Sequence, residues 1–182
     1  MSKFLFYTGI FLLFAAQQPK LVKTKISENI TARLPSDFFL LPPDELQGKS
    51  ISYRMPIAFY TDPAREVDFS VNNSASKWQN EDIELLKEIY KSNIQNLFDN
   101  VEFMKESIES INERDYIVFE FSGTVLPGES LFKQESPDRR YYYTEYTLKG
   151  SQIFIFTFTA PFQQKEQWAG TASAIMQSIK MK

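Results

Sequence analysis

The 182-residue sequence contains neither cysteine nor histidine. Their absence excludes disulfide bonds, thiolate nucleophiles and catalysis by Ser-His-Asp or Cys-His groups. It also excludes zinc sites built from these two ligands. No side chain titrates near neutral pH unless its surroundings shift its pKa. We therefore expect no cofactor, and we assign no catalytic, cofactor-binding or metal-binding residue.

The sequence also lacks any long run of charge of one sign. It carries 20 Lys and Arg residues against 23 Asp and Glu residues, which gives a net charge of −3. Binding to nucleic acid requires clustered Lys and Arg side chains. The charge pattern therefore disfavours a nucleic-acid partner, and it disfavours attraction to a membrane surface for the same reason.

The N-terminus carries an apolar run, residues 4–16, which follows Lys3 and precedes Gln17-Gln18-Pro19. This order is typical of a secretory signal peptide, whereas a membrane-spanning helix needs about 20 apolar residues. We therefore predict an exported protein, periplasmic or extracellular, with no membrane span after cleavage. The predicted organisation is a signal peptide over 1–18, a flexible lead-in over 19–27 and a single domain over 28–182.

Aromatic residues are abundant, with 17 Phe and 9 Tyr. From Asn80 to Phe98 apolar residues recur at three- and four-residue spacing, which predicts an amphipathic helix. A second helix is predicted in the terminal segment from Trp168 to Ile179. Alternating or continuous apolar patterns predict strands over 28–34, 56–61, 67–71, 101–111, 116–122, 139–148 and 151–159.

Successive strands joined by tight turns cannot be parallel, because a parallel step needs a crossover. In the last predicted strand, Phe154, Phe156 and Phe158 face one way, while Ile153 and Ile155 face the other. Both faces of the sheet should therefore be covered. The predicted fold class is α+β, a mostly antiparallel sheet with helices packed on it.

The order of these segments resembles the PsbP-like superfamily, which also contains a Ran-binding nuclear transport factor and many small exported bacterial proteins. The resemblance covers residues 28–181 and rests on element order and hydrophobic placement. Its main carriers are Ile30–Pro35, the turn Pro42–Leu46, the strand with Phe119 and Phe121, the hairpin at Lys149-Gly150 and the end from Trp168 to Ile179. It implies a three-layer α/β/α sandwich and a binding, assembly or chaperone-like role.

The tyrosines of segment 139–148 suggest a partner surface, because tyrosine gives rigid contact area with a polar tip. Tyr142 and Tyr146 share one parity and are expected in the core. The opposite parity is expected to be open, and the long connection over 123–138 is a further candidate, since long loops are often functional. The predicted partner surface comprises Leu131, Phe132, Arg139, Arg140, Tyr141, Tyr143 and Glu145.

These features predict an exported, non-enzymatic protein that binds another protein or a component of the cell envelope. One alternative is a glycoside hydrolase that uses Glu120 and Glu145 as its carboxylate pair, although both could simply be solvated or paired with nearby cations. Another is a purely structural envelope protein. Asp62, Glu66 and Asp68 could hold calcium through oxygen ligands, but acids are also common in ordinary turns.

Overall fold

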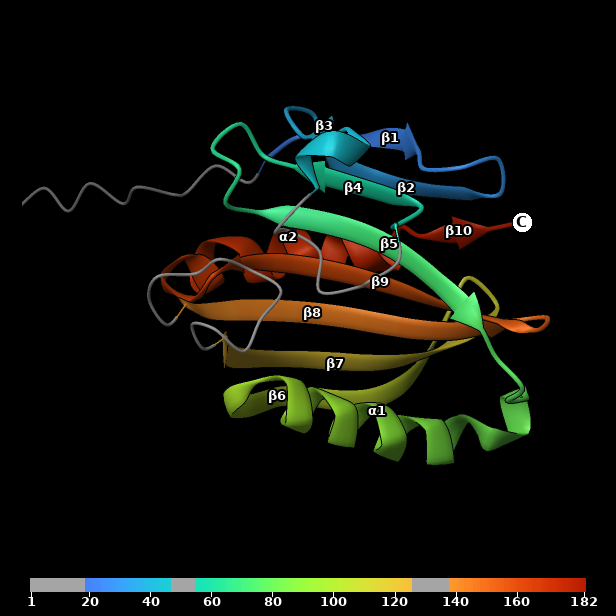
Figure 1. The fold of residues 1–182 in the computed structure, drawn as a ribbon. Helices are drawn as coiled ribbons and strands as arrows, with labels where there is room; N and C mark the ends of the chain where they lie inside the picture. Colours follow the sequence, from blue (N-terminus) through green and yellow to red (C-terminus); the bar gives the residue numbers. More distant parts are fainter. Residues whose placement is uncertain (1–18, 47–54, 126–137) are drawn as a thin grey trace, which may run out of the picture.

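The computed structural model describes residues 19–46, 55–125 and 138–182 (Figure 1). The strands are β1 Leu21–Lys25, β2 Ile30–Pro35, β3 Phe39–Leu40, β4 Ala58–Thr61, β5 Asp68–Ala75, β6 Asp99–Ile111, β7 Arg114–Val125, β8 Asp138–Lys149, β9 Gln152–Pro161 and β10 Lys180–Met181. The helices are α1 Ile83–Leu97 and α2 Lys165–Gln177, with 3₁₀ turns over Pro43–Glu45, Asn80–Asp82 and Phe162–Gln164.

Two antiparallel sheets are present in the described chain. The larger has the strand order β3-β4-β5-β9-β8-β7-β6, and the smaller has the order β1-β2-β10. The turn between β6 and β7 contains Asn112 and Glu113 with φ of 50° and 64°, and the turn between β8 and β9 contains Gly150 with φ of 58°. Two-residue hairpin turns favour such left-handed conformations because they match the twist of the strands.

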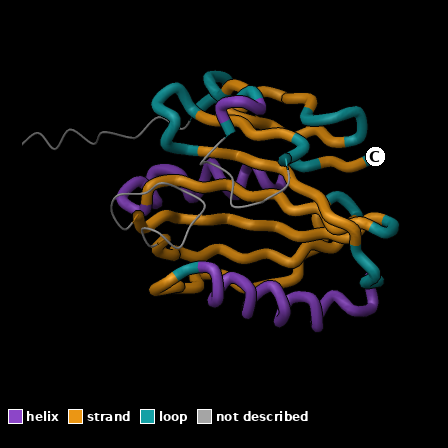
Figure 2. Tube along the Cα trace, viewed as in Figure 1, coloured by secondary structure: helices purple, strands orange, loops and turns teal. Residues whose placement is uncertain are grey.

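The larger sheet is the middle layer of the molecule. Figures 1 and 2 show α1 and α2 separated by its strands, with the smaller sheet beyond β5. Phe156 and Phe158 lie in the core cluster with α2 and the smaller sheet, whereas Ile153 lies in the cluster with α1. The predicted α+β class and the predicted split of the last strand into two buried faces are both confirmed.

Two segments that we expected to be irregular are strands. The lead-in forms β1, which pairs with β2 from Leu21↔Pro35 to Lys25↔Thr31. Its alternating lysines suit an edge strand, where charge discourages pairing with other chains. Residues 72–75, which lie beyond the strand predicted over 67–71, continue β5 because they pair with β9, from Asn72↔Ile155 to Ala75↔Gln152.

Helix α1 follows a 3₁₀ turn that is capped by Gln79. The Gln79 backbone N–H donates to Asp82 Oδ2 at 3.0 Å, and the Gln79 side chain completes a reciprocal capping box. Leu86 and Ile94 are buried on the sheet side, whereas Leu85 and Leu97 are exposed. Within the described residues, no helix has both the length and the apolar character required to cross a bilayer.

Gly123 on β7 is needed because Phe98 lies directly over it. A Cβ placed at this position would stand 2.9 Å from the Phe98 Cβ atom. We therefore expect Gly123→Ala to lower the free energy of unfolding by about 1–3 kcal/mol through overpacking. Gly170→Ala, an identical change at an exposed position of α2, should instead raise it by about 0.5–1 kcal/mol. Urea denaturation of both variants checks the opposite signs.

Candidate functional site

The tyrosine surface predicted from parity lies in the interior, which corrects the prediction. Tyr141 is 0%, Tyr143 2% and Glu145 0% exposed. Strand β8 lies between β7 and β9, so it has no open edge. The side-chain face that we expected to be open lies under α2 and the smaller sheet, because Tyr141 and Tyr143 belong to the same core cluster as Trp168 and Ala32.

Of the other predicted partner residues, Arg139 and Arg140 lie at the start of β8, and Leu131 and Phe132 precede that strand in the sequence. Leu131 and Phe132 fall outside the described residues, so their role stays a prediction. The Arg139 guanidinium stacks on the Phe162 ring, with 4.0 Å from Cζ to the ring centroid, and donates to Glu102 Oε2 at 2.7 Å and Ser122 Oγ at 2.8 Å. Arg139 is thus committed to contacts within the fold.

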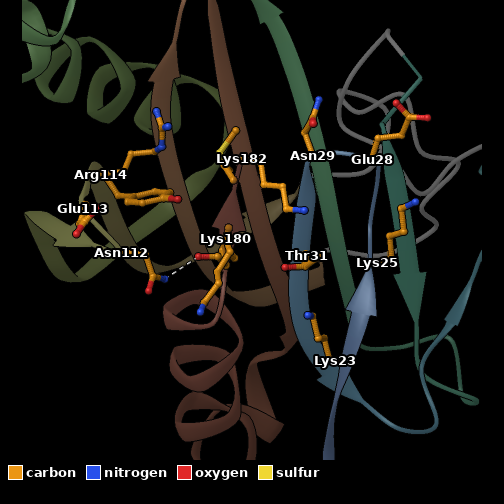
Figure 3. A pocket seen from close by; sticks show the side chains of 13 residues that line it. Lys23, Lys25, Glu28, Asn29, Thr31, Asn112, Glu113, Arg114, Lys180 and Lys182 are labelled. Atoms are coloured by element: carbon orange, nitrogen blue, oxygen red, sulfur yellow. Dashed lines mark hydrogen bonds between the residues drawn. The ribbon is translucent and has the colours of Figure 1, made fainter.

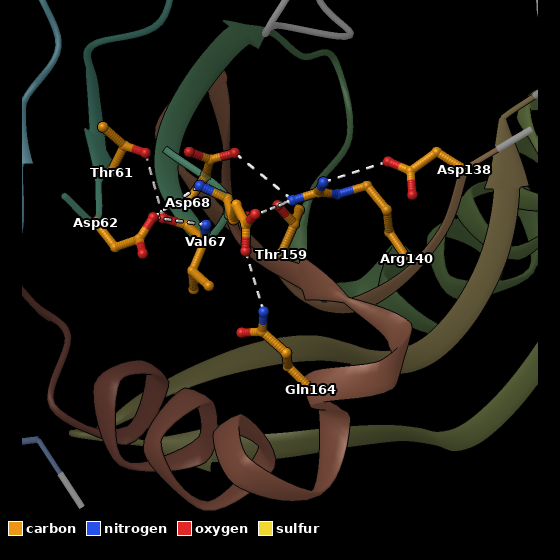
Figure 4. A network of polar contacts seen from close by, with 9 residues as sticks. Thr61, Asp62, Val67, Asp68, Asp138, Arg140, Thr159 and Gln164 are labelled. Carbon is orange, nitrogen blue, oxygen red and sulfur yellow. Dashed lines mark hydrogen bonds and ion pairs between the residues drawn. The ribbon is translucent and has the colours of Figure 1, made fainter. Parts of the chain in front are cut away.

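Arg140 ties three strands of the larger sheet together (Figure 4). Its guanidinium forms ion pairs with Asp68 at 3.8 Å and Asp138 at 3.3 Å, and it donates to Thr159 Oγ1 at 3.3 Å. Asp62 Oδ1 accepts the backbone N–H groups of Glu66 and Val67 at 2.7 and 2.9 Å, as an acid in an ordinary turn does.

Glu120 and Glu145 lie on the same face of neighbouring strands. Glu120 pairs with Tyr143, two residues from Glu145, which makes the two acids diagonal neighbours, about 7–8 Å apart. Glu120 Oε1 accepts the Tyr141 hydroxyl at 3.0 Å. Glu145 is fully enclosed, so it does not reach a substrate, and this geometry gives no support to the glycosidase alternative.

The Glu145 carboxyl is an unusual group for a core. Neither of its oxygens has a hydrogen-bond partner among the described residues. Burial raises its pKa to about 8, and the negative charge of Glu109 adds to this effect, while Lys105 opposes it. Lys105 is itself paired with Glu109 at 2.7 Å. The carboxyl is therefore protonated at neutral pH, which spares the fold a buried charge.

A groove of about 260 Å³ lies on the α1 face of the larger sheet. It exists because α1 packs on β6 and β7 and leaves part of β5, β9 and β8 uncovered. Its walls are apolar or aromatic, and its floor carries hydroxyl and amide groups. The lining residues are Phe59, Asp68, Ser70, Asn72, Asn73, Ser74, Ile94, Leu97, Phe98, Phe121, Tyr142, Thr144, Tyr146, Ile155, Thr157 and Thr159.

Two features make the groove floor a candidate binding surface. Asn72 Oδ1 is buried and has no hydrogen-bond partner among the described residues, so a ligand that donates a hydrogen bond there would satisfy it. Ser70 pairs with Thr157 across β5 and β9, which sets two polar side chains side by side on the groove floor. The signal in the sequence is the alternation of Ser70 with the buried residues Phe69 and Val71.

We expect Glu145→Gln to change how stability depends on pH. The folded-state pKa of about 8 lies above the ordinary value of 4.5. The contribution of the Glu145 carboxyl to the free energy of unfolding is therefore complete below pH 4.5 and is lost as the pH rises to about 8. As the pH rises through this window, the free energy of unfolding of the variant should increase by about 2–4 kcal/mol relative to that of the natural protein. Denaturant titrations at pH 4.5, 6 and 8.5 measure the difference. Glu166→Gln, at an exposed position, is the control and should show no such trend.

Comparisons with known proteins bear on the fold. No protein-family model matches the sequence, and no curated protein matches it. Solved structures do match over nearly the whole chain. The cyanobacterial PsbP of Synechocystis superposes with a TM-score of 0.62 at 9% identity, covering 92% of this chain and 96% of its own.

Two further structures match with similar coverage. LpqN, involved in cell envelope biogenesis of Mycobacterium tuberculosis, gives a TM-score of 0.57 at 12% identity and covers 90% of this chain and 91% of its own. The Ran-binding protein Mog1p of Saccharomyces cerevisiae gives 0.55 at 8% identity, covering 90% and 96%. The resemblance read from the order of elements is thus confirmed at the level of the fold, and the chain has the PsbP-like fold.

Proposed function

We propose that this chain is an exported, non-enzymatic binding protein and that the groove on the α1 face receives an uncharged segment of a partner polypeptide. The observation that carries the proposal is the groove floor, where Asn72 presents an unsatisfied acceptor between apolar walls. An extended segment can donate a backbone N–H to such an acceptor and place apolar side chains against the walls.

The chemistry of the lining selects an uncharged ligand. Among the described lining residues, Asp68 is the one charged side chain, and it is paired with Arg140. A charged ligand group would lose water here without meeting a free counter-charge, which is costly. The volume of about 260 Å³ is below the range of about 300–1,000 Å³ typical of small-molecule sites. It suits a few side chains better than a whole cofactor.

The groove also favours binding over catalysis. General acid–base chemistry needs a titratable group within hydrogen-bond reach of the reacting atoms, and the lining offers hydroxyls, amides and one paired carboxylate. The same fold occurs in a Ran-binding protein and in a protein involved in cell envelope biogenesis. These neighbours support our proposal that this chain has a binding role at the cell envelope.

The proposed export is tested by identifying the first residue of the mature protein. If residues 1–18 act as a signal peptide, the protein recovered from the periplasm or medium should begin between Gln17 and Pro19. Intact-mass measurement identifies the cleavage site. Replacing Leu12 and Leu13 by Arg should stop cleavage, because a charged core does not insert as an h-region. An uncleaved protein recovered from the cytosol of the natural strain would contradict export.

The groove is tested with a photo-crosslinking amino acid at Leu97. This side chain is 61% exposed and lines the groove, whereas Leu85 is 54% exposed on the same helix and does not. Crosslinking in living cells should give a discrete adduct from position 97 and none of the same mass from position 85. Thr157→Phe, which fills the floor, should reduce the adduct at least about fivefold, because it excludes apolar side chains from the site.

The controls separate loss of binding from loss of fold. The melting temperature of Thr157→Phe is measured first, and the adduct is compared only if the protein remains folded. Equal adducts from positions 85 and 97, or an adduct at 97 that survives filling of the floor, would show that the groove is not the binding site.

A further inference from the structure

The smaller sheet gathers lysines that are far apart in the sequence. Lys23 and Lys25 alternate along β1, and Lys180 begins β10. Lys182 follows two residues later, and its backbone N–H donates to the Asn29 carbonyl oxygen at 2.9 Å. Strand β2 lies between β1 and β10. Figure 3 shows these lysines around one cleft, together with Thr31 and Asn29.

The strand register places two of the lysines on either side of one threonine. Thr31 is the partner of Lys25 on one side and of Lys180 on the other. Directly opposed residues share a face of the sheet, so the Lys25 and Lys180 side chains flank the Thr31 hydroxyl at about 10 Å from each other. Lys23 and Lys182 also lie on this face. They stand on opposite sides of the Lys25/Lys180 pair along the strands, because Lys23 is opposite Arg33, whereas Lys182 lies beside Asn29.

The cleft has an excess of positive charge. Its volume is about 910 Å³, and its lining contains five cationic side chains, namely Lys23, Lys25, Arg114, Lys180 and Lys182. Two carboxylates, Glu28 and Glu113, also line it, so the side-chain charge is +5 − 2 = +3. Within the described parts of the chain, no salt bridge joins the four lysines to a carboxylate.

This arrangement is unfavourable without a ligand. Lys23 stands directly opposite Arg33, and like charges in that position destabilise a sheet. The four lysine side chains are exposed and have no carboxylate partner among the described residues. By contrast, Lys91 and Lys105, on α1 and β6, each have a carboxylate partner at 2.7 Å. The difference marks the cleft as a place where an external anion would relieve repulsion.

We propose that this cleft binds a phosphorylated ligand that carries two or more negative charges. Phosphate oxygens accept several hydrogen bonds at once, and lysine is a common phosphate ligand that acts as a point charge. Lys25 and Lys180 can contact one phosphoryl group from both sides while Thr31 donates from beneath. A second phosphoryl group that extends along the strands toward Asn29 would meet Lys182, with Asn29 as a neutral donor. One that extends the other way would meet Lys23.

The site is separate from the groove of the proposed function. The groove lies on the α1 face and is nearly neutral, whereas the cleft is formed by the smaller sheet and the β6–β7 hairpin. Asn112 holds that hairpin against the segment between α2 and β10, because its side-chain amide donates to the Ile179 carbonyl oxygen at 2.8 Å. A negative result for one of the two sites therefore leaves the proposal for the other unaffected.

The probe is inorganic tripolyphosphate, titrated into the purified protein by isothermal calorimetry at low salt. We expect binding that weakens as sodium chloride is added, because salt screens exposed charge. Lys25→Gln with Lys180→Gln should weaken binding at least about tenfold, since it removes two charge-assisted contacts. Thr31→Val, which keeps the shape of the side chain, should weaken it by a smaller factor.

The matched control removes the same number of charges elsewhere. Lys87→Gln with Lys165→Gln alters two lysines outside the cleft that have carboxylate neighbours, Glu84 and Glu166. Affinity within about twofold of the natural protein is expected, because the ligand does not contact these positions. Equal loss in both double variants would overturn the proposal in favour of attraction to overall charge, and so would an absence of binding to the natural protein.

A second experiment distinguishes a lipid headgroup from a soluble compound as the phosphorylated ligand. Sedimentation with vesicles of phosphatidylcholine containing phosphatidic acid is compared with pure phosphatidylcholine vesicles. Co-sedimentation that depends on phosphatidic acid and is lost in the Lys25/Lys180 double variant assigns the site to a lipid headgroup. Binding of tripolyphosphate without co-sedimentation assigns it to a soluble phosphorylated compound. Both results support the site itself.

Discussion

The hairpin of β8 and β9 buries large aromatic side chains on both faces, and the rest of the structure depends on this constraint. Phe158 lies 5.8 Å from Trp168 of α2 by ring centroids, and on the other face Tyr142 stacks on Phe121 at 4.9 Å. A sheet with two such faces is stable only when both are shielded from water. The long amphipathic helix, the terminal helix and the smaller sheet supply that shielding, which accounts for the three layers.

The two covers are unequal, and the inequality generates the candidate site. On one side, α2 and three short strands close over β5, β9 and β8 together. On the other side a single helix packs on β6 and β7. Polar side chains such as Ser70 and Thr157 appear where cover is missing, and an unsatisfied amide oxygen of Asn72 lies among them. The candidate groove thus lies where the second layer is incomplete.

Periodicity predicted the elements well because it reports local burial. The alternation of Phe154 and Ile153, and the three- and four-residue spacing in α1, follow directly from which side chains face the core. Parity does not reveal how many layers lie above each face, so Tyr143 and Glu145 were expected at a surface and are enclosed. Net charge likewise does not reveal where charged side chains gather in the fold. Lys25 and Lys180 lie near opposite ends of the chain, and only the register of β2 brings them to one threonine.

The pairing of β10 with β2 has a consequence for the order in which the protein forms. Closing a loop of some 150 residues costs more entropy than closing a hairpin, and contacts of such long range form slowly. During synthesis β1 and β2 leave the ribosome well before β10, the strand that completes their sheet. The cationic cleft is therefore absent from a chain in which only local contacts have formed, so that its presence marks a chain in which β10 has already reached β2.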